Sequence, residues 1–185
     1  MKPSKHLWLS VGFALASASV AGAQRVPGEP VPPRAALPTA PAAIEISAQE
    51  HAVLAQLHAA NVLEIKAGKL ALKQAAARDV RRYGESLVKD HTKADRELTT
   101  LAKRNGVKLA AVPDVTLADL KARRGTDFDR AFLALMIHDH QQTMDTVRSA
   151  QNQAQNADVR ALLDKTLPAL EQHEQHAQQL AGGHS

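Results

Sequence analysis

Four polar, titratable side chains lie on the apolar stripes of four segments that have helical periodicity. They are Glu64, His91, His140 and His173. His91 shows the pattern most clearly, because it lies between Leu87 and Ala94 on a stripe whose members recur every three or four residues. A polar group on a buried stripe needs a partner, or it lowers stability. Since each of the four lies near the middle of its segment, we expect them to meet in one layer.

Three imidazoles and a carboxylate form a suitable ligand set for one divalent transition metal ion, such as Zn, Fe, Mn or Cu. A metal-binding histidine usually donates its other ring N–H to an acceptor, and Asn61, Asp95 and Asp139 are the side chains expected to serve. The same residues could instead form a buried hydrogen-bond network that sets the helix register without any chemistry. The residue types leave both interpretations open.

Four long amphipathic helices must position these side chains. Ser47 and Glu50 form a capping box at the start of the first helix, which extends to about residue 76. Asp79 is the expected cap of the second helix, which ends at Asn105-Gly106. Thr126 is the expected cap of the third, and the fourth spans about 157–180.

The connections between these helices indicate the fold class. Short turns join the first two and the last two helices, whereas roughly twenty residues separate the second from the third. Such a long connection lets the second and third helices run parallel. The aromatic content of 3% also disfavours a β-sandwich. We therefore expect an all-α protein: a ferritin-like antiparallel four-helix bundle over residues 47–181, with a long connection between helices two and three.

The residues before the bundle have the composition of a targeting segment followed by a linker. Lys2 and Lys5 precede an apolar run over 7–20, and Ala21-Gly22-Ala23 is a small-x-small cleavage site. We therefore expect a signal peptide over 1–23, although its retention as an anchor stays open. Residues 24–46 contain six prolines and are expected to form a disordered linker. We therefore expect an exported protein that is periplasmic or, alternatively, extracellular or associated with the outer membrane.

Composition excludes several functional classes. The chain has no cysteine, which excludes disulfides and thiolate sites. Without Lys2 and Lys5, 21 basic residues face 19 acidic ones, and a net charge of +2 is too small to indicate nucleic acid as a partner. After signal cleavage no stable membrane span is expected. The partner stays open between an envelope protein and a second copy of this chain. No motif assigns a reaction, so whether the protein is an enzyme stays undecided.

Several short segments carry a resemblance to a known family. They are Asn61-x-x-Glu64, Asp90-His91-Thr92-Lys93-Ala94, Phe128-Asp129-Arg130, His140, and Leu167-Pro168 with His173. In their order and spacing over 47–180, the chain resembles the bacterial domain-of-unknown-function family DUF4142, a ferritin-like group of exported proteins. Residues 83–87 depart from the aromatic-Ala and Met that the family tends to show there. The resemblance implies a ferritin-like fold and an exported location, and it supplies no reaction.

The spacing also limits the kind of metal centre. Di-iron bundles use a Glu from each of two helices and Glu-x-x-His from each of the other two. Here Val88 and Leu170 lie three residues before His91 and His173, so a di-iron centre is not expected. We expect a site for a single metal ion or a small ligand, with a role in metal handling or envelope stress, or a structural module as the alternative.

Overall fold

The computed structural model describes residues 45–112 and 117–183, which form five helices. They are α1 (Ala48–Gln74), α2 (Arg78–Arg104), α3 (Ala118–Ala122), α4 (Gly125–Gln151) and α5 (Ala157–Gly183). None of these helices combines the length and the apolar character that crossing a membrane requires. The predicted signal peptide and nearly all of the predicted linker lie outside the described residues. The all-α prediction of four long helices is confirmed.

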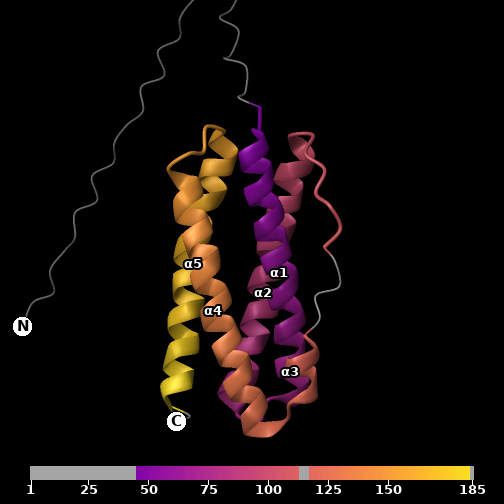
Figure 1. Cartoon of the computed structure of the whole chain (residues 1–185), viewed down its shortest axis with the longest axis vertical. Helices are drawn as coiled ribbons and strands as arrows, with labels where there is room; N and C mark the ends of the chain where they lie inside the picture. The colour runs from indigo at the N-terminus through magenta and orange to yellow at the C-terminus, as the bar shows by residue number, and fades with distance from the viewer. Residues whose placement is uncertain (1–44, 113–116, 184–185) are drawn as a thin grey trace, which may run out of the picture. The chain divides into compact units, whose positions relative to one another are not determined.

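The order of the helices in space is that of a ferritin-like bundle (Figure 1). In this view α1 runs downward, α2 and α4 both run upward, and α5 runs downward. At one end of the bundle, Ala75 forms an isolated bridge with Gly125. At the other end, Glu50 Oε1 accepts a hydrogen bond from the backbone N of Asn156 at 2.8 Å. The long connection before α4 therefore returns the chain to the end where α2 began, which makes α2 and α4 parallel.

Two helix ends differ from the predicted caps. Asp79 does not cap α2, because the residue before the helix is Ala77, which makes no side-chain cap. Instead, the carboxylate of Asp129 on α4 accepts hydrogen bonds from the amides of residues 76 and 77, at 3.0 and 2.9 Å. Thr126 does not cap α4 either, because the helix already begins at Gly125, whose φ is +61°. A distant carboxylate and a left-handed glycine replace the local caps, and neither produces a capping pattern in sequence.

The interior consists of two apolar clusters with polar residues between them. The first cluster, toward the Ala75–Gly125 end, includes Tyr83, Leu87, Phe128, Phe132 and Met136. The second, toward the Glu50–Asn156 end, includes Leu54, Leu57, Leu98, Val147 and Leu163. Along each long helix the residues of the two clusters are separated by one of the four polar side chains. The two clusters keep water from the polar layer along the bundle axis, which strengthens electrostatic interactions inside it.

Candidate metal centre

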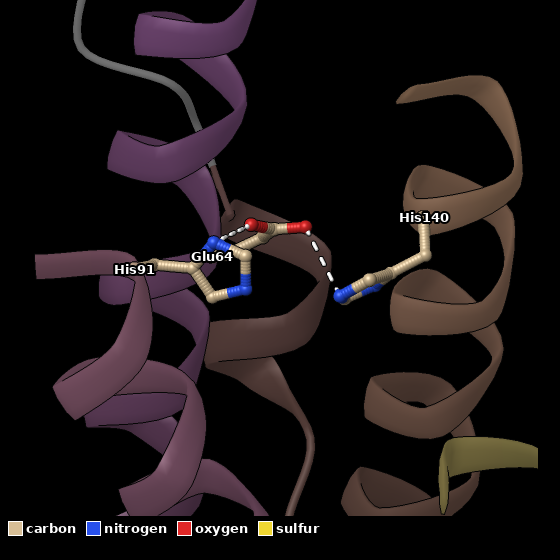
Figure 2. Close-up of side chains that lie close together, drawn as sticks. All are labelled: Glu64, His91 and His140. Carbon is tan, nitrogen blue, oxygen red and sulfur yellow. Dashed lines mark ion pairs between the residues drawn. The ribbon is translucent and has the colours of Figure 1, made fainter. Parts of the chain in front are cut away.

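Glu64 of α1, His91 of α2 and His140 of α4 come together in the middle of the bundle (Figure 2). One ligand atom from each of them lies within 4.8 Å of the other two. Their exposed fractions are 0%, 5% and 0%. In the described part of the chain, no other group of three His, Asp or Glu ligands lies this close together. Three separate helices therefore deliver three metal-ligating side chains to one buried point.

His173 of α5 lies in the same layer but outside that tight group. Its ring centroid is 5.3 Å from that of His91 and 5.7 Å from that of His140. Its Nε2 lies 3.4 Å from Asp90 Oδ2. The four predicted side chains thus form one layer, in which Asp90 engages the fourth.

A backbone contact determines the tautomer of His140. Its Nδ1 lies 2.7 Å from the carbonyl oxygen of Met136. A carbonyl can only accept, so Nδ1 carries the proton and Nε2 presents a lone pair. That Nε2 faces Glu64 Oε1 at 3.5 Å (Figure 2). Two lone pairs that face one another are favourable only with a cation or a proton between them.

The surroundings of His91 determine its tautomer in the same way. Its Nδ1 lies 3.0 Å from Asn61 Oδ1 and 2.6 Å from Glu64 Oε2. Both neighbours are acceptors, so Nδ1 carries the proton and Nε2 the lone pair. The single N–H donates to Asn61, and Glu64 Oε2 is left without a hydrogen bond although it is close. Asn61 is therefore the hydrogen-bond acceptor for His91.

Buried polar atoms without a hydrogen-bond partner are concentrated at this centre. Among the described residues six such side-chain atoms occur, and five belong to it: Glu64 Oε1 and Oε2, His91 Nε2, Asp139 Oδ2 and His140 Nε2. Leaving a buried acceptor unpaired costs on the order of 1–3 kcal/mol. The Glu64 and Asp139 carboxyls lie close enough to share a hydrogen bond when one of them is protonated. A proton satisfies part of this group, and a cation would satisfy the imidazole nitrogens as well.

The other two predicted acceptors differ from one another. Asp139 lies beside Glu64, where burial and the charge of Glu64 raise the pKa of Asp139 to about 7. Asp95 does not contact His91. Its Oδ1 lies 2.6 Å from Nδ1 of His58 on α1, and His58 is half-buried. Asp95 lies one turn beyond His91, where α2 faces a different residue of α1.

Burial keeps the imidazoles neutral. It lowers the pKa of His91 and that of His173 to about 4, and it also lowers the pKa of His140. Burial raises the pKa of Glu64, and the neighbouring His140 opposes that shift. A neutral imidazole is the form that binds a metal, so these histidines need release no proton to do so.

Three contacts that position the layer were missed by sequence reasoning. The hydroxyl of Tyr83 donates to the carbonyl oxygen of His173 at 3.1 Å, which anchors α5 at that level. Asp90 Oδ2 lies 3.4 Å from Nε2 of His173, and the Met136 carbonyl orients His140. Of these contacts, only that of Asp90 could have been found from the sequence, because Asp90 is a charged residue next to His91. The other two use backbone carbonyls, which leave no pattern in the sequence.

Solved structures with a similar fold have little sequence in common with this chain. A DUF305 fragment from Deinococcus radiodurans matches with a TM-score of 0.69 and 14% identity over 75% of this chain and 99% of its own. CopM in the Cu(I)-bound form matches with a TM-score of 0.65 and 15% identity over 72% of this chain and 96% of its own. Identities this low show the fold alone. No curated protein matches the chain.

The match to a family model is more extensive. The model for DUF4142, a domain of unknown function, matches residues 35–180. This range includes every residue of the polar layer and nearly all of the four long helices. The chain therefore belongs to the DUF4142 family.

Proposed function

We propose that this protein binds one transition metal ion in the core of its bundle, through Glu64, His91 and His140. One observation carries the proposal: lone pairs of two imidazoles and a carboxylate, all buried and without hydrogen-bond partners, converge from three helices. An ion there would satisfy atoms that otherwise destabilise the fold. The chain supplies the ligands, and the apolar clusters keep the site dry.

The donor set favours late first-row metals. Two imidazole nitrogens and a carboxylate suit zinc and copper(II), whereas calcium and magnesium prefer oxygen ligands only. Iron and manganese bind such sites more weakly in the usual order of affinities. The fold similarity to CopM, whose structures include Cu(I)-, Cu(II)- and Ag-bound forms, supports copper as the first metal to test. A role in metal handling or in envelope stress fits these properties.

A matched pair of histidines on α4 tests the proposal. His140 is buried in the centre, and His138, two residues earlier, is exposed. Protein purified without a histidine tag is titrated with Zn²⁺, Cu²⁺, Mn²⁺ and Fe²⁺, and bound metal is measured by elemental analysis. We expect one ion per chain in the wild type and in His138→Gln, and an affinity lower by on the order of 100-fold or more in His140→Gln. Sub-stoichiometric metal that no added ion increases, or equal affinity in the two variants, would contradict the proposal.

A structural network is the second candidate, and the hydrogen bond from His91 to Asn61 supports it. Replacing buried polar partners together by apolar residues is often neutral or stabilising. If the layer only sets the helix register, the double variant Glu64→Leu with His91→Leu should retain its stability, and the wild type should gain none from added metal. Urea unfolding with and without copper or zinc separates the two candidates.

Export is the remaining part of the proposed function, and its support comes from the composition of residues 1–23. N-terminal sequencing of the protein from a periplasmic fraction of the source bacterium should give a chain that begins at Gln24. A chain that begins at Met1 in the cytoplasmic fraction would refute export.

A further inference from the structure

A cavity of about 210 Å³ opens beside the centre, with walls contributed mainly by α1, α2 and α5 and by Thr143 of α4. Its inner end is polar and includes Glu64, His91 and His173. The remaining wall is mostly apolar and includes Leu57, Ala60, Leu98, Leu162, Ala169 and Leu170. The alanines leave space where larger side chains would close the wall. The candidate metal centre is therefore adjacent to a cavity instead of being sealed by side chains on every side.

The ligand count leaves one position for a molecule in that cavity. Metal sites that close their shell use four protein ligands, whereas sites with three protein ligands keep a fourth position for water or substrate. Here three side chains form the tight group. His173, the one further imidazole in the layer, lies outside this group, and its Nε2 is 3.4 Å from Asp90 Oδ2. The position that remains faces the cavity, because Glu64 and His91 belong both to the centre and to the cavity wall.

The size and the lining of the cavity indicate the chemical class of its ligand. An apolar cavity of about 150 Å³ admits benzene, so about 210 Å³ holds a single ring with room to spare. The mouth carries Asp90, Lys93, Glu97 and Lys165, and Lys165 pairs with Glu97. Two charges of each sign give no preference for an anion or a cation. An apolar wall with a metal at its inner end therefore selects a neutral molecule that has an apolar body and one donor atom.

We propose that this cavity takes a neutral, one-ring-sized organic ligand whose single donor atom completes the coordination of the bound metal. This inference rests on the proposed function, since the donor atom needs the metal. The ligand enters between α2 and α5 and places its apolar body against the leucines. The cavity would thereby make the metal centre a binding site for small molecules.

The experiment uses the full chain loaded with Co²⁺, whose visible absorption bands respond to a change of ligand, and pyridine as the probe. Benzene, which has the same ring without a donor atom, serves as the matched probe. Two exposed alanines on α5 supply matched variants: Ala169 lines the cavity, and Ala161 does not. Ala94→Leu on the α2 wall is an independent second variant. Circular dichroism verifies the fold of each variant.

We expect pyridine to change the Co²⁺ bands saturably in the wild type and in Ala161→Leu. Its affinity should fall at least tenfold in Ala169→Leu and in Ala94→Leu. Benzene should leave the bands unchanged and compete with pyridine. If one Co²⁺ binds per chain but pyridine changes nothing, or binds all variants equally, the inference is wrong and the proposed function stands. If neither Co²⁺ nor Zn²⁺ or Cu²⁺ binds, both are wrong.

Discussion

Met136 and Asn61 determine which nitrogen of each buried imidazole carries its proton. Their oxygens accept from Nδ1 of His140 and of His91, at 2.7 and 3.0 Å. Both Nε2 atoms are thereby left with a free lone pair. That of His140 faces Glu64 Oε1 at 3.5 Å, whereas His91 approaches Glu64 Oε2 through its Nδ1 at 2.6 Å. The oxygens of Met136 and Asn61, which are not metal ligands themselves, therefore set the tautomers of the two histidine ligands.

Asn61→Ala should weaken metal binding without removing a ligand. The variant loses the acceptor that holds the His91 ring and its tautomer, and such outer contacts are typically worth about 10- to 100-fold in metal affinity. Competition titration with zinc or copper measures the change. Asn152→Ala, which alters an exposed amide at the end of α4, is the control and should leave the affinity unchanged. Equal affinities in the two variants would show that Glu64 alone orients His91.

Asp139→Asn should stabilise the metal-free protein, and more so at higher pH. Burial and Glu64 raise the pKa of Asp139 from 3.8 to about 7. The folded state thus binds this proton more tightly than the unfolded state. The contribution of Asp139 is complete below pH 3.8 and is lost as pH rises through 7. Asparagine does not titrate, and its amide can donate to Glu64.

We expect this variant to exceed the wild type in free energy of unfolding by on the order of 2 kcal/mol at pH 8, with the difference shrinking toward pH 4. Urea unfolding of chelator-treated protein at pH 4, 6 and 8 measures it. Glu64, His91 and His138, which also act on Asp139, are present in both proteins, so their own titration largely cancels. Asp145→Asn, an exposed change on α4, should show no such trend. A difference in free energy of unfolding that stays constant with pH would contradict the raised pKa of Asp139 beside Glu64.

At the level of helices, α1 and α2 pack closely against one another at two glycines. A Cβ on Gly84 would lie 2.6 Å from Ala71 Cβ and 3.0 Å from Gly68 O, and a Cβ on Gly68 would lie 2.7 Å from Gly84 O. Gly68 is one turn beyond Glu64 on α1. The two glycines let the helix backbones come close enough for Glu64 to reach His91 at 2.6 Å.

Gly84→Ala should destabilise the protein, although alanine is the better helix former by about 1 kcal/mol. The added methyl must push α1 away from α2, and overpacking of this kind typically costs about 1–3 kcal/mol. Urea unfolding measures the effect, and weaker metal binding should accompany it. Gly182→Ala, whose Cβ meets nothing within 4 Å, should be neutral or stabilising. A stabilised Gly84→Ala would mean that the helices separate at no cost.

Sequence periodicity was sufficient to predict the long helices and the side chains that point into the bundle, because a 3.6-residue repeat shows which face of a helix is buried. Glu64, His91, His140 and His173 were predicted from that repeat, and all four are buried in one layer. The predicted caps of α2 and α4 were wrong, because Asp129 acts on α2 from another helix and α4 begins at the left-handed Gly125. Asp95 was assigned to His91 because helical spacing does not show which residue of the neighbouring helix lies opposite.

For the molecule as a whole, the proposed centre would join two hairpins. Glu64 and His91 belong to the α1–α2 hairpin, and His140 belongs to the α4–α5 hairpin. The long connection, of which residues 105–112 and 117–124 are described, is the covalent link between them. A bound ion would therefore add a link in the middle of the bundle, far along the chain from that connection.

Zinc should stabilise the bundle, and the gain should depend on both hairpins. At a free zinc concentration 100 times the Kd, binding to the folded state adds about 2.7 kcal/mol to the free energy of unfolding. Urea unfolding with and without zinc measures this gain, and amide hydrogen exchange in α1 and α4 should slow together. His138→Gln should keep the full effect. In His140→Gln the gain should vanish, although Glu64 and His91 are intact, because two ligands from one hairpin cannot hold the ion against water. If His140→Gln keeps the gain, the ion is held by the α1–α2 hairpin alone and does not link the two halves of the bundle.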